Sequence, residues 1–303
     1  MKILILGHTG LVGSNLLERI RDKHEVVGIS RRDGFDLLDK EKTKWFIEMW
    51  RPEIVYHLAA QSAQTRGEIS PIDTTERNLN IFLNVLIPCI NAKVKRFIYT
   101  SSVAVYGEAD VPYSEDDIMK PKDIYGVNKW AAEQILKILS KVHGIEYTIF
   151  RPHNIYGPHQ DMASPYKNVT ALFMRNIMED RECVIYGGGK MRRAFSYVDD
   201  VIDVLVEAMG EKFKNQTLNV GSSIDVDLIT LLSMIEKVAG KKAKIKHLPA
   251  RPQEIYLFLC NHRKLSNFFE YHETPLEEGL KKTWDFINLP KIKEENDEIH
   301  TNS

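Results

Sequence analysis

Long apolar runs are missing from this sequence of 303 residues. No stretch approaches the roughly 18 consecutive apolar residues that a membrane-spanning helix needs. The first residues have the pattern of a buried strand and lack the basic and apolar segments of a secretory signal. We therefore expect a soluble protein of the cytoplasm, with a flexible, charged tail over residues 291–303.

Cysteines are few, and metal-binding patterns are absent from the sequence. Cys89, Cys183 and Cys260 form no CxxC pair and no even set, which argues against a disulfide framework. The ten histidines show no spacing typical of metal ligands, and we interpret His57, at the end of a predicted strand, as structural. We predict reduced thiols and no bound metal.

The sequence has no excess charge of either sign. Its 41 Lys and Arg residues are matched by 42 Asp and Glu residues, for a formal net charge of −1 and a pI of about 6.8. This balance gives no electrostatic basis for binding nucleic acid or an anionic membrane. Apolar residues make up 43% of the chain, enough for a large core, and we favour one α/β domain with a smaller lobe.

A strand pattern opens the chain and is followed at once by glycines. Residues 2–6 are continuously apolar after Lys2, as in a strand buried on both faces of a parallel sheet. Gly7, Gly10 and Gly13 follow, and apolar residues then recur at helical spacing. This order suits a dinucleotide, because its pyrophosphate must approach N–H groups at a helix N-terminus, where a Cβ would be in the way. Glycines that serve only turn and packing are the alternative.

Strands and helices alternate through the first half of the chain. This order predicts a doubly wound parallel α/β sheet of the Rossmann type with a smaller C-terminal α/β lobe. We assign residues 1–152 to the dinucleotide-binding domain, completed by segments around 194–220, and residues 153–290 mainly to a substrate lobe. The further predicted strands and helices are residues 25–30, 43–49, 53–60, 74–91, 96–100 and 125–142.

The end of the second predicted strand carries Ser30, Arg31 and Arg32. Strands of this kind in NAD sites usually end in an acidic residue for the ribose hydroxyls, whereas a hydroxyl and two guanidinium groups favour a 2′-phosphate. The cofactor is therefore NAD or NADP, and this segment favours NADP. Solvated loop arginines are the alternative, with Asp33 or Asp36 reaching the ribose.

Tyr125 and Lys129 stand four residues apart at the start of a predicted helix and share one of its faces. A phenol ordinarily has a pKa near ~10, and a neighbouring ammonium and a cationic nicotinamide would stabilise its phenolate. Ser102, after the preceding strand, can hydrogen-bond the same substrate oxygen. This spacing alone is common on ordinary surface helices, but here it follows the glycine turn and the Ser-Ser strand end in the required order.

Six motifs between Gly7 and Asp200 carry a resemblance: GHTGLVG, HLAA, YTSSVAVYG, YGVNK, RPHNIYGP and RRAFSYVDD. Together they resemble the extended short-chain dehydrogenase/reductase family, in its NAD(P)-dependent nucleotide-sugar epimerase/dehydratase branch. The resemblance implies Ser102, Tyr125 and Lys129 as catalytic residues and Asn78 as a supporting helix residue. The cofactor-binding residues that we predict are Gly7, Thr9, Gly10, Leu11, Val12, Gly13, Ser30, Arg31, Arg32, Asp36, Leu37, Leu58, Ala59, Ala60, Asn78, Thr100, Tyr125, Lys129 and Pro152.

The later part of the chain holds candidates for a nucleotide-diphosphate sugar. The resemblance implies Asn154 at the diphosphate and Arg193 at the nucleotide, and both supply donors that suit phosphate oxygens. Surface charge is an equal alternative for two of the others, Arg251 and Glu254. The predicted substrate-binding residues are Gln61, Ser102, Tyr125, Asn154, Asn168, Val169, Tyr186, Arg193, Arg251 and Glu254.

The residues after Ser102 discriminate between reactions of the family. Related dehydratases carry an Asp-Glu pair there and related epimerase/reductases a cysteine, whereas this chain has Val103, Ala104 and Val105. The main hypothesis is a nucleotide-sugar epimerase acting at C4, by reversible hydride transfer to bound NAD(P) through a 4-keto intermediate. The alternative is a C4 dehydrogenase or 4-ketoreductase, which Ser30-Arg31-Arg32 favours. A non-catalytic NADP-sensing protein is the third hypothesis.

Two predicted helices carry enough apolar residues to pair across a two-fold axis. The resemblance implies a homodimer through a four-helix bundle, and burial of both faces within one subunit is the alternative. The apolar residues concerned are Leu79, Phe82, Leu83, Leu86, Trp130, Ile135 and Leu139.

Overall fold

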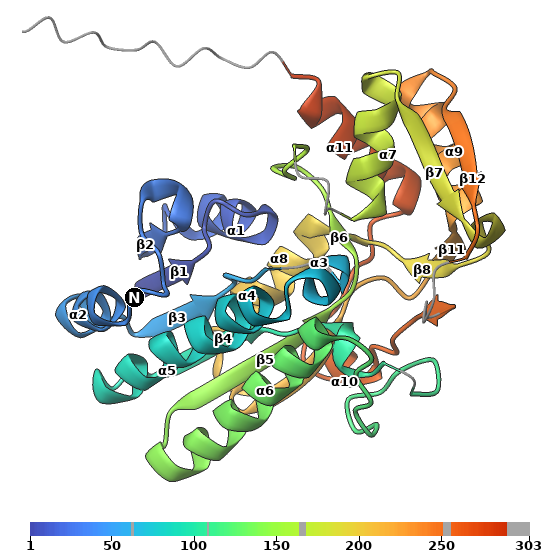
Figure 1. The fold of residues 1–303 in the computed structure, drawn as a ribbon. Helices are drawn as coiled ribbons and strands as arrows, with labels where there is room; N and C mark the ends of the chain where they lie inside the picture. The colour runs from blue at the N-terminus through green and yellow to red at the C-terminus, as the bar shows by residue number, and fades with distance from the viewer. Residues whose placement is uncertain (62–63, 108, 164–167, 251–255, 290–303) are drawn as a thin grey trace, which may run out of the picture.

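A parallel sheet of six strands forms the centre of the computed structural model (Figure 1), which describes residues 1–61, 64–107, 109–163, 168–250 and 256–289. The strand order is β10-β5-β4-β3-β1-β2, and every neighbouring pair is parallel. This is the doubly wound arrangement that the alternation of strands and helices predicts. The strands are β1 (Lys2–Leu6), β2 (Glu25–Ile29), β3 (Ile54–His57), β4 (Arg96–Thr100), β5 (Glu146–Pro152) and β10 (Gln216–Val220).

Helices cover both faces of this sheet. Leu4 and Leu6 of β1 belong to the core on one face, and Ile3 and Ile5 belong to the core on the other. Because alternate residues of a strand point to opposite faces, a strand buried on both sides must be apolar throughout. One face carries α2 (Lys40–Trp50), α5 (Ile81–Asn91) and α6 (Ile124–His143), and the other carries α1 (Leu11–Ile20) and α8 (Val198–Glu207).

The second half of the chain builds a smaller lobe beside the sheet (Figure 1). The lobe contains β6 (Ile155–Tyr156), α7 (Val169–Met178), β7 (Glu182–Tyr186), β8 (Arg192–Ala194), β9 (Ser196–Tyr197), β11 (Asp225–Asp227), α9 (Leu228–Ala239), β12 (Lys244–Leu248), β13 (Leu257–Phe258) and α11 (Leu276–Ile287). Its core lies between α7, α9, α11 and the strand β7. The chain still returns to the large sheet, through α8 and β10, after the lobe has begun.

The helix predicted over residues 74–91 is interrupted. The structure has α4 (Pro71–Thr75), then a π-helical turn (Glu76–Asn80), and only then α5. A π turn adds a residue to the helical repeat and rotates the side chains that follow, and such turns are frequent at functional sites. The remaining short helices are α3 (Gln64–Ile69), α10 (Arg263–Ser266) and the 3₁₀ turns Arg31–Asp33, Val103–Val105, Gly187–Gly189 and Glu211–Phe213.

The three cysteines are buried and unpaired with one another. No helix among the described residues combines the length and the apolar character that crossing a bilayer requires. The same part of the chain contains no group of His, Cys, Asp and Glu side chains placed to hold a metal ion. The residues predicted as a tail, 291–303, lie outside the described residues.

Among the residues that the structure describes, three histidines are buried, and their burial predicts a loss of stability in acid. Burial lowers the pKa of His57 to about 3 and the pKa values of His153 and His262 to about 4. The unfolded chain therefore binds more protons than the folded protein below pH ~6.5, so the free energy of unfolding falls as the pH is lowered from there. We expect a loss of a few kcal/mol between pH ~6.5 and ~4, measured by urea unfolding. His57→Leu should reduce this loss, whereas replacing the exposed His272 should leave it unchanged.

Candidate active site

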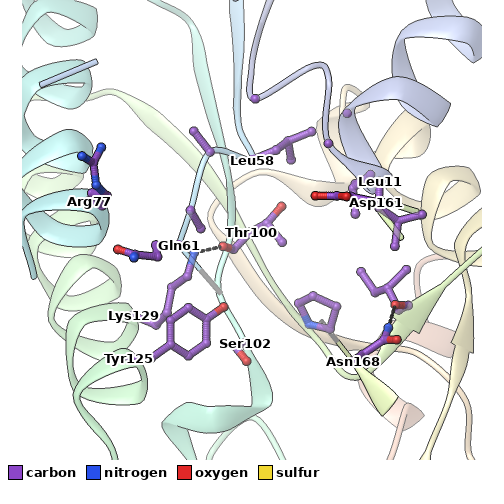
Figure 2. A pocket seen from close by; sticks show the side chains of 18 of the residues that line it. Leu11, Leu58, Gln61, Arg77, Thr100, Ser102, Tyr125, Lys129, Asp161 and Asn168 are labelled. Atoms are coloured by element: carbon purple, nitrogen blue, oxygen red, sulfur yellow. Dashed lines mark hydrogen bonds between the residues drawn. The ribbon is translucent and has the colours of Figure 1, made fainter. Parts of the chain in front are cut away.

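A cavity of about 750 Å³ opens where the carboxyl ends of the sheet strands meet the smaller lobe (Figure 2). This edge is where ligands bind in open α/β sheets. The cavity is lined by nearly all of the cofactor-binding residues that the sequence predicts, from the glycine loop to Pro152. Asn78 is the one predicted cofactor residue that is not in its lining.

The glycine loop has the shape that a pyrophosphate requires. Gly7 has a φ of +88°, and a Cβ built on it would lie 2.9 Å from the Ala59 nitrogen. A Cβ built on Gly13 would lie 2.3 Å from the Gly7 oxygen. A Cβ on Gly10 would meet only the Gly7 oxygen, at 3.3 Å, so the protein itself leaves the space above Gly10 open. Gly10 also begins α1 without a side-chain cap. The unsatisfied N–H groups of α1 therefore face an open cradle that fits a dinucleotide pyrophosphate.

The residues after β2 form a polar cluster beside this loop. The Thr9 hydroxyl donates to the Ser30 hydroxyl at 3.0 Å, and the Ser30 hydroxyl donates to the Asp33 carboxylate at 2.7 Å. The Arg32 guanidinium donates to the Thr9 carbonyl at 3.2 Å. Ser30, Arg31 and Arg32 line the cavity, as does Asp36, whereas Asp33 stands behind Ser30.

Tyr125 and Lys129 project from the first turns of α6, which Asp123 caps by accepting a hydrogen bond from the Gly126 N–H at 2.7 Å. The Lys129 ammonium donates to the Thr100 carbonyl at 2.7 Å and lies 5.7 Å from the centre of the Tyr125 ring. Figure 2 shows the Tyr125 hydroxyl on the side of the ring where Ser102 lies. The structure thus brings the three residues together on one wall of the cavity.

Burial controls the protonation of this group. It raises the pKa of Tyr125 to about 12, and a hydrogen bond with the Ser102 side chain acts in the opposite direction. It lowers the pKa of Lys129 to about 7, and the charge of Glu133 opposes that change. A lysine that titrates near neutral pH can respond to small changes in nearby charge. A further positive charge beside Tyr125 would favour its phenolate.

Asn78 supports the cavity wall from behind. It lies in the π-helical turn and is buried, and its amide group donates to the Thr74 carbonyl at 2.8 Å and to the Gln61 carbonyl at 3.2 Å. Its side-chain oxygen accepts the Gln61 N–H at 3.1 Å. Asn78 therefore fixes the backbone of Gln61, which does line the cavity.

On the lobe side, three of the predicted substrate residues line the cavity: Asn154, Asn168 and Arg193. Asn168 caps α7, since its side-chain oxygen accepts the Ala171 N–H at 3.1 Å. The Arg193 guanidinium packs 4.8 Å from the centre of the Phe258 ring. The same guanidinium donates to the Arg192 carbonyl at 2.8 Å and to the Tyr256 carbonyl at 3.1 Å, so the lobe itself holds this side chain in place at the cavity.

Two other predicted substrate residues are not brought to this cavity. Val169 begins α7 and Tyr186 ends β7, and neither lines it. Asn168 lines the cavity as the N-cap of α7, whereas Val169 is the first residue of the helix itself. The remaining two, Arg251 and Glu254, lie outside the described residues.

Several lining residues were not predicted from the sequence, and the charged ones among them are Arg77, Asp123 and Asp161. The Arg77 guanidinium donates to Asp73 at 2.6 Å and stands 3.8 Å from the Asp36 carboxylate. The Asp161 carboxylate lies 3.4 Å from the Arg32 guanidinium. Arg77 faces inward within the π turn, and Asp161 arrives from the other lobe, so a local motif contains no signal for either.

Comparison with known proteins places the chain among sugar-nucleotide enzymes. Residues 3–221 match the NAD dependent epimerase/dehydratase family. The UDP-glucose 4-epimerase of Mycolicibacterium smegmatis is 28% identical over 310 residues, covering 95% of this chain and 98% of the relative. The match spans both lobes and the cavity between them.

Solved structures give the same picture. UDP-glucose 4-epimerase from Thermotoga maritima, solved with UDP-glucose, has a TM-score of 0.89 and 27% identity, covering 95% of this chain and 98% of the other. UDP-glucuronic acid 4-epimerase from Bacillus cereus, solved with UDP-glucuronic acid and NAD, has a TM-score of 0.86 and 27% identity, covering 95% and 99%. Similarity at this level extends over nearly the whole of each chain.

Proposed function

Because the chain belongs to the NAD-dependent epimerase/dehydratase family, we propose that it epimerises a nucleotide-diphosphate sugar at C4. The observation that carries this proposal is the group of Ser102, Tyr125 and Lys129 on one cavity wall, opposite donors of the smaller lobe. The resemblance that the six motifs indicate is confirmed by the family match. UDP-sugars are the first substrates to consider, since the relatives named above act on them.

The residues have separable roles in this reaction. A bound nicotinamide dinucleotide would accept a hydride from the sugar carbon and return it. Tyr125 takes the proton of the sugar 4-hydroxyl while the hydride leaves the C4 carbon. It gives the proton back when the 4-keto sugar is reduced on its other face. Ser102 shares that proton and orients the sugar oxygen. Lys129, held by the Thr100 carbonyl at 2.7 Å, places its amine close to the phenol, and the protonated form of that amine favours the phenolate.

The wall beside Ser102 favours redox chemistry at a single carbon over elimination. Val103 and Ala104 line the cavity there and offer neither acid nor base. Asp123 also lines the cavity, but its carboxylate accepts the Gly126 N–H at 2.7 Å as the cap of α6. A dehydratase needs an acid and a base beside the hydroxyl and the neighbouring carbon. Hydride transfer to a bound nicotinamide and back would need only one acid–base group, and the phenol of Tyr125 supplies it.

The cofactor is a nicotinamide dinucleotide, and NAD is the one found in the Bacillus cereus relative. The glycine loop would hold its pyrophosphate and Lys129 would lie near the nicotinamide end. We propose that NADP can also enter, at lower affinity than NAD, because Ser30, Arg31 and Arg32 line the cavity after β2 and carry donor groups that suit a 2′-phosphate. The same three residues favour the second candidate function, an NADPH-dependent 4-ketoreductase.

Incubation with UDP-glucose, UDP-glucuronic acid, and GDP- and dTDP-hexoses, with and without added NAD or NADP, tests the proposal. An epimerase forms the C4 isomer, seen by chromatography, with no net absorbance change at ~340 nm. A net change at that wavelength instead identifies a dehydrogenase or ketoreductase. Cofactor binding with no turnover of any sugar nucleotide would support the non-catalytic hypothesis.

We also propose a homodimer formed by α5 and α6. Two of the residues predicted for such an interface, Phe82 and Leu86, are instead buried against the sheet of their own subunit. Outward-facing apolar side chains remain on the same helices, at Ile87, Val127, Trp130, Ile138 and Val142. An exposed stripe of this kind is typical of a contact surface.

The mass in solution tests this interface. We expect light scattering to give about twice the 34.9 kDa chain mass for the wild type. Trp130→Glu places a charge in the stripe and should shift the protein towards the monomer. Trp45→Glu, at an exposed tryptophan of α2, is the matched control and should leave the mass unchanged. A monomeric wild type contradicts the proposal.

A further inference from the structure

An ion pair crosses the cavity between Arg32, which follows β2, and Asp161, which precedes α7. The Arg32 guanidinium stands 3.4 Å from the Asp161 carboxylate, and both residues line the cavity. We propose that Asp161 determines cofactor preference, favouring NAD over NADP, by occupying the guanidinium that a 2′-phosphate needs. This inference rests on the proposed function only in requiring that the cavity holds a nicotinamide dinucleotide.

Arg32 is held from two sides. One guanidinium nitrogen donates to the Thr9 carbonyl at 3.2 Å, which keeps the side chain beside the glycine loop. The other faces Asp161. The guanidinium thus lies where the adenosine half of a dinucleotide follows the pyrophosphate, and it reaches that place already paired with a carboxylate.

Asp161 is positioned by its neighbours. Asn15 of α1 donates to the Pro158 carbonyl at 3.0 Å, and Glu18 of α1 lies 2.9 Å from the His159 ring nitrogen. The segment before Asp161 is therefore anchored to the helix that follows the glycine loop. Figure 2 shows Asp161 on the side of the cavity away from Tyr125 and Lys129, as expected for a residue at the adenosine end.

NAD and NADP differ at the adenosine ribose, where NADP carries one additional phosphate. A 2′-phosphate carries close to two negative charges and forms its strongest contacts with unpaired guanidinium groups. Asp161 competes for Arg32 and also repels the phosphate, whereas the ribose hydroxyl of NAD meets neither obstacle. Asp33, which accepts the Ser30 hydroxyl at 2.7 Å, adds a second carboxylate to the same cluster. Asp161 thus offsets the charge of Arg32, and this pairing lets an arginine stand after β2 while the site favours NAD.

The test is the ratio of the dissociation constants of NADPH and NADH, measured by fluorescence titration of the full-length protein without substrate. We expect Asp161→Asn to lower the constant for NADPH about tenfold and to leave that for NADH within about twofold. Adding Arg32→Ala to Asp161→Asn should abolish the gain, because the freed guanidinium is its source.

Glu18→Gln is the matched control, because it loosens the same segment through His159 without altering the charge beside Arg32. It should leave the ratio unchanged. An unchanged ratio in Asp161→Asn, or an equal shift in Glu18→Gln, overturns the role of Asp161. If the wild type binds neither nucleotide, the proposed function fails, and the inference fails with it.

Discussion

Tyr125→Phe is expected to lower the rate of C4 isomer formation about 10³-fold while leaving NADH binding unchanged. The change removes only the phenol oxygen, which is the group placed to accept and return the proton of the sugar hydroxyl. General acid–base groups contribute rate factors of about 10²–10⁴. Burial raises the pKa of Tyr125 to about 12, so the phenol stays protonated at neutral pH and can accept a proton only when a positive charge beside it favours the phenolate.

The measurement compares turnover of the sugar nucleotide with a separate titration of NADH. Tyr147→Phe is the matched control, because Tyr147 lies near the start of β5, at the opposite edge of the sheet from the cavity. It should leave turnover within about twofold of the wild type. If the Tyr125→Phe enzyme keeps more than about a tenth of the wild-type rate, another group transfers the proton of the sugar hydroxyl.

The parts of the site that the sequence predicts are those encoded by short local patterns. The glycine turn after Lys2–Leu6 and the four-residue spacing of Tyr125 and Lys129 each lie within one strand–turn–helix or one helix. The local backbone determines where such side chains point, so their positions follow from backbone preferences and from the residue repeat of the helix or strand. Parallel pairing then brings the separate strand ends to one edge.

What the sequence could not predict depends on packing between distant segments. The family resemblance implied Asn78 as a supporting helix residue, but a regular helical period does not predict the π turn Glu76–Asn80 from which Asn78 contacts Gln61. Asp161 reaches Arg32 across 129 positions of the chain, a contact that no local motif encodes. Apolar spacing on α5 also could not tell the face buried by the sheet from the face left outside, so Phe82, predicted for the dimer interface, is buried in its own subunit, whereas Ile87 is exposed.

A buried ion pair beneath the active site leads to the second large effect. Arg151 of β5 donates to both carboxylate oxygens of Glu133, at 3.0 Å and 2.7 Å, and both side chains are almost fully buried. Arg151 also donates to the Tyr106 hydroxyl at 2.8 Å, which in turn donates to Asn219 at 2.6 Å. Glu133 lies on α6, two turns after Tyr125, so the pair ties the catalytic helix to the sheet.

Glu133→Leu is expected to lower the free energy of unfolding by about 3–5 kcal/mol, because it leaves the Arg151 charge buried without a counter-charge. Adding Arg151→Met should recover much of that loss, since two apolar side chains of similar volume often replace a buried pair at little cost. Urea unfolding of the two single variants and the double variant measures the coupling between the residues. Asp285→Asn, which breaks the exposed pair with Lys281, is the control and should change stability by less than about 1 kcal/mol. Additive losses in the double variant would show that Glu133 and Arg151 stabilise the fold independently, and α6 would then be positioned by its apolar packing alone.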